Sequence, residues 1–553
     1  MADQGKNSSG NFAPIVAIGI MASRVMGLLR WSIMARYFGS GAHADVLRAA
    51  FQAPNALQNL LGEGTISAAF IPVYSKMLEE GRAEDAGRFA GSILGLMIAA
   101  VSIGVLIGMW LAHPICSILM RGFVGDAAEV VAGVREIDRL LLAVDMVRLA
   151  FPMAGMLVLS SWALGVLNSH RRFHVSYLAP VIWNVTIIAA LLIGGSMTGH
   201  LHEGQDNYVL PEILTQLLKT VFIGGMIGGL LQFLVQLPSI IRVIKGFRLS
   251  LSTRIEGVRE SLRAVGPALA GRGVAQISAY VDILLATLLV EGAVSSIGYA
   301  QVLYILPISL FGLAVAAAEL PELSRLAAHG SKGMAKRIHA GLRQGLFLAT
   351  PTALGYIALG YALISAIYQG GLFDVDDNWL AYIILAVYSL GLLATISSRL
   401  LQNGFWALGD TRTPARMAAV RAAIALVIAI PTMFFLDEFS VSLIPGVGPS
   451  TLYFGAVGLA AGSSMAAWIE WWLLRRRLKR RLEIDFIPWT FIGQILLYVV
   501  ISLIPALVVW YLMQDVFHII TGICVVGVFA GSYLILSYLR KIPELYSWMK
   551  VVK

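Results

Sequence analysis

The stretch SRVMGLLRWSIMARYFG, residues 23–39, places three arginines in a run that otherwise consists mostly of apolar side chains. These arginines are Arg24, Arg30 and Arg36, and the apolar run that holds them begins near residue 13. A helix rises about 1.5 Å per residue, so about 20 residues cross a hydrocarbon core about 30 Å thick. The run is therefore long enough to span a membrane, and the rest of the chain decides whether it does.

Composition predicts a membrane protein. The chain has 553 residues, of which 58% are hydrophobic and only 13% are charged, and its mean hydropathy is +0.78. Soluble globular proteins carry roughly 25% charged residues. Such a shortage of charge indicates that most of the surface meets lipid.

Apolar runs long enough to cross a membrane recur along the whole chain at even spacing, which predicts an all-α polytopic protein with no soluble domain. We count about fourteen of them: 13–38, 44–73, 87–112, 139–168, 175–197, 213–241, 262–290, 294–320, 338–368, 379–407, 415–436, 451–474, 488–513 and 516–539. The first run is longer than the apolar core of a signal peptide and contains arginines, so we interpret it as a span. The two cysteines, Cys116 and Cys524, are expected to be buried thiols.

The connections between these runs alternate in charge. Those after even-numbered runs are basic, as in RRRLKRR at 475–481, whereas those after odd-numbered runs hold few Lys or Arg, as in GGLFDVDDN at 370–378. Cytoplasmic loops carry the excess of Lys and Arg. The pattern therefore predicts that the basic connections and both termini lie in the cytoplasm.

Two charged motifs invite other interpretations. The run at 475–481 resembles a nucleic-acid patch, but it follows Trp-rich sequence at the end of a span, which favours contact with anionic headgroups. DVDD at 374–377 has no His or Cys nearby, so we expect a solvated loop rather than a metal site. We find no hydrolase, phosphate-loop or deaminase pattern, and we expect no enzyme activity, no cofactor and no nucleic-acid partner.

The arginines of the first run stand at different depths. Arg24 is expected near mid-bilayer, Arg30 in the outer half and Arg36 near the outer interface. Six residues turn a helix by about 240°, so the three cannot share one face. We expect Arg36 to extend to the interface, and Arg24 and Arg30 to point into the protein.

Charged side chains recur in other spans. The second run carries Asp45, Arg48 and Glu63, with Pro54 and nearby glycines predicting a broken helix, and the seventh run carries Arg272. Such residues can form neutral pairs that hold helices together, which is the interpretation we favour for Asp145 and Arg148 of the fourth run. Elsewhere cations exceed anions, and a surplus of guanidinium groups in a membrane cavity suits a phosphate or carboxylate ligand.

The two halves of the chain resemble each other at an offset of about 250 residues: FIPVYSKMLEEG at 70–81 parallels ELPELSRLAAHG at 319–330. Parallel repeats of this kind build transporters with two lobes. We therefore predict an N-terminal lobe of six helices at 1–245, a C-terminal lobe of six helices at 246–480, and two extra helices at 481–553.

Several motifs resemble the MurJ/MviN family of lipid II flippases. They are SRVMGLLR (23–30), ADVLRAAFQAPNALQNLLGEGTISAAFIPVYS (44–75), QISAYVD (276–282), IYQGGLFD (367–374) and ALGDTRTP (407–414). The resemblance implies the transporter fold of the MOP superfamily, fourteen helices, alternating access of two lobes, and a location in the bacterial inner membrane. It also implies a polyprenyl-diphosphate lipid as substrate, with its tail in a groove formed with the last two helices.

The same resemblance assigns substrate-binding residues. Ser23, Arg24 and Arg30 match the family's first-helix motif, Asp45 and Glu63 match its second-helix acids, and Ser295 falls at a cavity serine. We add Arg48 and Arg272 as a hypothesis of our own. They would replace positive charge that the family has elsewhere, because Gln58, Gln301 and Val302 stand where charged residues are usual, and Trp31 stands where an acid is expected.

These departures leave alternatives open. The first is that the chain flips another polyprenyl-linked glycan or exports drugs, and the second is that it is a non-transporting scaffold descended from a flippase. The expected partners are the lipid substrate and membrane lipids, with the cell-wall synthesis machinery as a further candidate. The leading prediction is a lipid II flippase that grips a diphosphate with buried arginines.

Overall fold

The computed structural model describes residues 13–62, 66–67, 69–198, 210–327, 331–514 and 516–546, without the side chains of 13–18, 267–277, 313–314, 317–318 and 331. The described residues form helices joined by short connections, and their only β pairing is two isolated bridges. The chain divides into two compact units, Met1–Leu288 and Leu289–Lys553, which are described one at a time.

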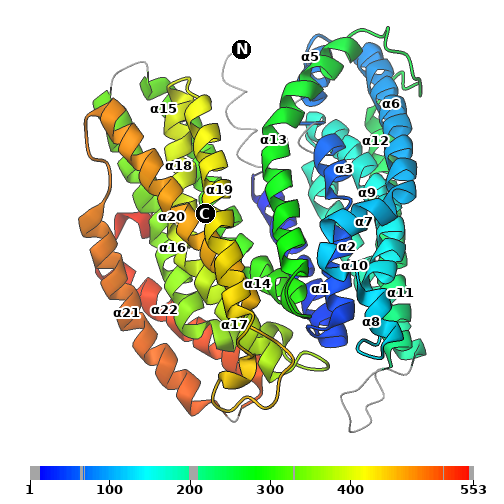
Figure 1. Ribbon diagram of the computed structural model, residues 1–553. Coiled ribbons are helices and arrows are strands. Elements are labelled where there is room, and N and C mark those ends of the chain that lie inside the picture. The colour runs from blue at the N-terminus through cyan, green and yellow to red at the C-terminus, as the bar shows by residue number, and fades with distance from the viewer. Residues whose placement is uncertain are drawn as a thin grey trace. The chain divides into compact units, whose positions relative to one another are not determined.

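Unit 1 contains the helices from α1 to α13 (Figure 1). They are α1 (Ala13–Phe38), α2 (Ala42–Gln52), α3 (Asn55–Leu61), α5 (Ile71–Glu79), α6 (Ala83–Trp110), α7 (Ala112–Leu119), η1 (Arg121–Phe123), α8 (Asp126–Val131), α9 (Arg139–Ser169), α10 (Phe173–Met197), α11 (Pro211–Leu234), α12 (Leu237–Val243) and α13 (Val258–Thr287).

Unit 2 contains the remaining helices, with a π-helical turn, η2, in the middle of one span. They are α14 (Ala293–Pro307), η2 (Ile308–Leu313), α15 (Ala314–Ala327), α16 (Ser331–Tyr368), α17 (Val375–Leu390), α18 (Leu392–Ala407), α19 (Arg412–Leu436), η3 (Val441–Leu443), α20 (Gly455–Leu482), α21 (Trp489–Leu512) and α22 (His518–Leu539). The last two helices pack on each other and on α16.

The prediction of an all-helical polytopic membrane protein is confirmed, but the count of fourteen spans is not. Among the described residues, 10 helical stretches are long and apolar enough to cross a membrane. The other four predicted spans are helical too: α1, the broken second span, α13 and α20. α1 and α13 are not among the ten because some of their side chains are not described. α20 is not among them because it carries Glu470 and the basic run.

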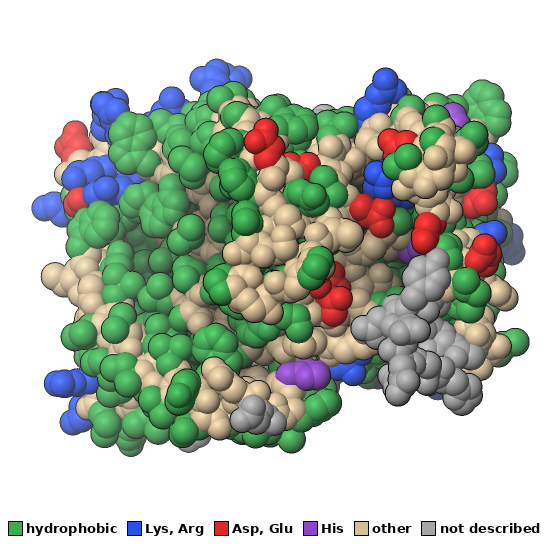
Figure 2. All heavy atoms as spheres, turned by 60° about the horizontal axis from the view of Figure 1, so that its bottom comes forward, with side chains coloured by type: hydrophobic (Ala, Val, Ile, Leu, Met, Phe, Trp, Pro, Cys, Tyr) green, Lys and Arg blue, Asp and Glu red, His purple; other side chains and the backbone are tan. Residues whose placement is uncertain are grey.

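Large hydrophobic side chains cover the outside of these helices (Figure 2). Trp110 is 80% exposed, Met197 81% and Val427 73%. A soluble monomer rarely exposes so much contiguous apolar surface. Lipid is therefore the environment that this surface fits.

The segment 244–257 between α12 and α13 is extended and lies along α6. A Cβ atom at Gly87, Gly91 or Gly95 of α6 would stand only 1.8 to 2.2 Å from a backbone oxygen of this segment. The stripe of three glycines is therefore what allows the two backbones to approach so closely.

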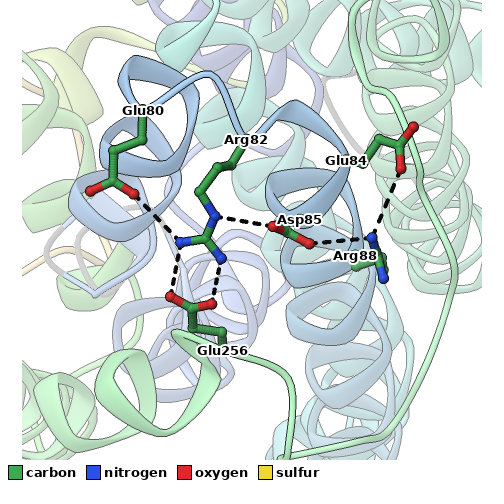
Figure 3. Close-up of polar contacts among 6 residues, drawn as sticks. All are labelled: Glu80, Arg82, Glu84, Asp85, Arg88 and Glu256. Atoms are coloured by element: carbon green, nitrogen blue, oxygen red, sulfur yellow. Dashed lines mark hydrogen bonds and ion pairs between the residues drawn. The ribbon is translucent and has the colours of Figure 1, made fainter.

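An ionic cluster fixes the far end of that segment (Figure 3). Arg82 donates from Nη1 to Glu256 Oε1 at 2.9 Å, makes a second bond to the same carboxylate, and reaches Asp85 from Nε at 3.0 Å. Ser261, in the first turns of α13, donates to the backbone oxygen of Ala69 at 2.7 Å. These contacts place α13 with unit 1, whereas the predicted lobes divide at 245/246, and that lobe assignment stays a prediction.

The predicted break in the second span is confirmed, and a side chain of α13 forms hydrogen bonds with the backbone groups that the break leaves unpaired. The helix stops after Gln52 and restarts at Asn55, beyond Pro54. The Tyr280 hydroxyl accepts a hydrogen bond from the Ala56 amide at 2.8 Å and donates to the Ala53 oxygen at 3.0 Å. One side chain of α13 thus supplies a donor and an acceptor where the helical ladder is interrupted.

Candidate functional site

Arg30 occupies an aromatic cage inside unit 1. Its guanidinium carbon lies 4.4 Å from the centroid of the Trp183 ring, 5.4 Å from Trp31 and 5.8 Å from Phe51. The rings come from α1, α2 and α10. An aromatic face attracts a cation within about 6 Å, by about 2 kcal/mol when both are desolvated.

Further contacts hold the cage rings in place. The Trp183 indole donates to the Gly225 oxygen of α11 at 3.1 Å, and Phe51 stacks on Phe222 with centroids 4.7 Å apart. Because α11 supports both rings from behind, their faces stay turned toward the guanidinium. The cage is thus assembled by two pairs of consecutive helices, α1 with α2 and α10 with α11, and the two pairs lie far apart in the sequence.

Arg30 keeps its charge without an anionic partner among the described residues. The side chain is 8% exposed, and Nε and Nη1 are buried with no hydrogen-bond acceptor. A guanidinium cannot shed its proton in a protein. The interior of unit 1 therefore holds an unneutralised positive charge with unused donors.

Arg48 adds a second cation near the same indole. Its guanidinium carbon is 5.5 Å from the Trp31 centroid. Asp45, one turn earlier on α2, is 1% exposed. The structure therefore brings Arg30, Arg48 and Asp45 into one region, where Trp31, the departure from the family pattern, contacts both guanidiniums.

The other predicted site residues lie elsewhere or outside the described part. Ser23 is half-buried on α1, and Arg24 is exposed at the surface of unit 1 rather than packed inside it. Ser295 belongs to unit 2, where it is 2% exposed and donates to the Gly292 oxygen at 3.1 Å. Glu63 and the side chain of Arg272 lie outside the described residues.

Two smaller predictions have clear outcomes. Asp145 and Arg148 lie 3.6 Å apart, so they pair as predicted, but both stand on α9 and are about half exposed, and the pair therefore does not join two helices. DVDD at 374–377 is not a solvated loop, because Asp374 caps α17 in a capping box with Asp377, and Asp376 accepts from Ser450. Within the described ranges, no group of three or more His, Cys, Asp and Glu could hold a metal ion.

Sequence reasoning missed the cage rings. Phe51 and Trp183 stand in apolar spans, where aromatic residues are common and carry no distinguishing signal. Only the packing of α10 and α11 against α1 and α2 turns their faces toward Arg30. The one usable signal was the arginine itself, which needed some compensation inside a membrane.

An apolar cavity of about 240 Å³ lies between α16 and α22 of unit 2. It is lined mostly by aliphatic and aromatic side chains, among them Leu359, Tyr356, Phe529 and Tyr533. A cavity with so little polar lining accepts hydrocarbon rather than a headgroup.

Comparisons with known proteins agree with the fold. The probable lipid II flippase MurJ of Vibrio cholerae serotype O1 is 31% identical over 84% of this chain and 82% of its own length. A lipid II flippase MurJ structure in an inward closed conformation matches with a TM-score of 0.70 and 22% identity, covering 95% of this chain and 98% of that one. An inward-facing MATE transporter of the MOP superfamily matches with a TM-score of 0.59 and 14% identity, covering 85% of this chain and 98% of that one.

A family model carries the assignment further. The model described as "Lipid II flippase MurJ" matches residues 34–530, which include the cage residues of α2 and α10, all of α16 and the first part of α22. Together with the ten apolar helices found in the described part of the chain, this makes the protein a multi-pass bacterial membrane protein. The chain belongs to the MurJ family of lipid II flippases.

Proposed function

We propose that this chain flips lipid II, the polyprenyl-diphosphate precursor of peptidoglycan, across the bacterial inner membrane. Membership of the MurJ family is the observation that carries the proposal. The relatives that match over most of their length are named as flippases of this lipid. In this proposal the protein acts as a transporter with no chemical step and no cofactor, and the energy comes from ion or voltage gradients or from downstream consumption of the flipped lipid.

In this proposal the arginines of unit 1 grip the diphosphate. Arg30 supports it because the charge is unneutralised and two nitrogens lack an acceptor. Those nitrogens are enclosed, so a phosphate oxygen reaches them only after a cage ring moves. Arg48 shares the Trp31 ring and would join the same contact. Arg24, Ser23, Asp45, Glu63, Arg272 and Ser295 complete the proposed set.

The lipid tail would occupy the apolar cavity between α16 and α22. Its lining of Leu, Phe and Tyr suits a polyprenyl chain, whose burial gains about 0.8 kcal/mol per CH₂ group. The headgroup would cross between the lobes by alternating access while the tail stays in lipid. Both termini and the basic connections would lie in the cytoplasm.

Complementation tests the proposal. Cells depleted of their own lipid II flippase are supplied with the parent chain, with Arg30→Ala, or with the control Arg325→Ala, whose arginine is 77% exposed beside Glu322. We expect the parent and the control to restore growth and Arg30→Ala to fail at equal membrane abundance.

Two results would contradict the proposal in different ways. Growth on Arg30→Ala equal to the parent would remove Arg30 from the site and leave the substrate assignment intact. Failure of the abundant parent chain to restore growth would favour a different polyprenyl-linked glycan or the non-transporting scaffold.

A further inference from the structure

A second group of charged side chains meets inside unit 2, on α18, α19 and α20. Glu470 is 2% exposed and accepts hydrogen bonds from Arg421 Nη1 at 3.0 Å and from Gln402 Nε2 at 3.0 Å. Arg399 lies close enough to Arg421 and Glu470 for its charge to interact with both. None of these four residues belongs to the site proposed above.

The charges of this group do not balance. Two guanidiniums, which stay protonated, face one carboxylate, and Arg421 already binds that carboxylate. Arg421 is nine residues into α19, about 13 Å along the helix from its start at Arg412. A single surplus positive charge therefore stands well inside a membrane span, where an unpaired charge is costly.

Arg399 carries that surplus. Its Nε is buried with no hydrogen-bond acceptor, and the side chain makes no ion pair with any residue in the described part of the chain. A guanidinium placed this way resembles a binding group awaiting an anion more than a structural link. A structural arginine would engage its acceptor, as Arg337 does with Glu319 in the same unit.

Other donors surround Arg399. The Tyr304 hydroxyl, which shares a 3.3 Å hydrogen bond with Thr395 Oγ1, is near enough to interact electrostatically with Arg399 and Arg421. The Tyr304 ring is held by stacking on Tyr388, with centroids 5.1 Å apart. The Arg421 side chain is 29% exposed, so it is not fully enclosed by the protein.

We propose that Arg399, Arg421 and Tyr304 form a binding site for one oxyanion of the phosphate type. The surplus of one positive charge matches a singly charged group. The planar guanidinium fork favours a phosphate oxyanion over chloride, because it binds two oxygens at once. Inorganic phosphate and the phosphodiester of a lipid headgroup share this chemistry, and either can be the source.

A phosphate titration tests the site. The full chain, in neutral detergent with gluconate in place of chloride, is titrated with inorganic phosphate while its thermal unfolding midpoint and Trp emission are followed. Trp471 follows Glu470 directly on α20, and Trp471→Phe identifies its share of the emission change. We expect saturable stabilisation of the parent chain, and a half-saturating phosphate concentration about tenfold higher in Arg399→Gln.

Matched variants separate charge from folding. Glu470→Gln keeps a hydrogen-bonding side chain but removes the only carboxylate, so it should bind phosphate about threefold more tightly. Arg399→Lys keeps the charge and loses the fork, and should weaken binding about threefold. Arg325→Gln, at an arginine 77% exposed beside Glu322, should leave the phosphate response unchanged. The readout is phosphate binding by the purified chain rather than growth, so this test stands apart from that of the flippase site.

A second arm distinguishes the sources. In nanodiscs of phosphatidylcholine with phosphatidylglycerol, whose headgroups both carry a phosphodiester, a lipid source predicts that the phosphate response seen in phosphate-free detergent disappears. A free-ion source predicts the same response as in that detergent. The proposal is overturned if the parent shows no saturable response in detergent. It is also overturned if Arg399→Gln stays within about twofold of the parent, or if Glu470→Gln weakens binding.

Discussion

Arg30 retains its charge in an apolar interior because aromatic faces replace the carboxylate that it lacks. The shortest of these contacts is to Trp183, at 4.4 Å. A double-mutant cycle of Arg30→Met and Trp183→Leu should give a coupling free energy of unfolding of about 2 kcal/mol. Stability measured by denaturant unfolding in micelles checks it. A coupling near zero would mean that the rings only fill space around the side chain.

His43 gives the protein a pH dependence at the connection between the first two spans. Its Nε2 lies 3.0 Å from Thr215 Oγ1 of α11, and burial lowers the pKa of His43 to about 4, opposed by a hydrogen bond with the Pro211 backbone. The folded state therefore favours the neutral ring. Stability is full above the unfolded pKa of about 6.5 and falls as the pH drops from there toward 4.

The shift of His43 corresponds to about 3 kcal/mol at most, at 1.36 kcal/mol per pKa unit. Thermal unfolding between pH 7 and pH 4 measures it, with His43→Asn expected to flatten the profile. His174→Asn is the control, because His174 is exposed. A parent profile as flat as that of His43→Asn would refute the assignment.

At the scale of elements, the break between α2 and α3 depends on one hydroxyl group. Tyr280→Phe keeps the ring but leaves the Ala56 amide and the Ala53 oxygen without their partner. The cost should be about 2 kcal/mol, with faster hydrogen exchange at Ala56. Tyr511→Phe, at a residue 74% exposed on α21, is the matched control. Unchanged exchange at Ala56 in Tyr280→Phe would show that water serves the break equally well.

Some features of single helices could be predicted from the sequence, and others could not. α1 has the predicted bounds, because a long apolar run with no Gly–Pro pair can only be a helix in lipid. The break at Pro54 was predictable because proline removes a ladder donor. Its tyrosine partner was not, since Tyr280 lies more than 200 residues away. The role of the glycine stripe of α6 could not be predicted either, because it depends on the segment 244–257 that packs against it.

The whole molecule shows the same division. Composition alone predicts a membrane protein, and the family motifs predict the fold. Both predictions succeed because each depends on many residues together. The site depends on a few positions, and there the outcomes differ. Arg30 is buried as predicted, whereas Arg24 is exposed. Exposure along a span depends on which neighbours pack there, and a single sequence does not specify them.

Orientation is the property of the whole molecule that charge predicts most directly. The chain has two cysteines, Cys116 and Cys524, so replacing both with Ser gives a background for single-cysteine labelling in intact cells. Thr253→Cys, in the basic connection before α13, should react with a membrane-impermeant maleimide only after lysis. Pro449→Cys, in the connection between α19 and α20, should react in intact cells, because that connection has no Lys or Arg. Both positions are exposed, so burial cannot explain a failure to label.

These two connections follow the sixth and eleventh predicted spans, so opposite labelling requires an odd number of crossings between them. Labelling of both from the same side would mean that one predicted span among the five between them does not cross.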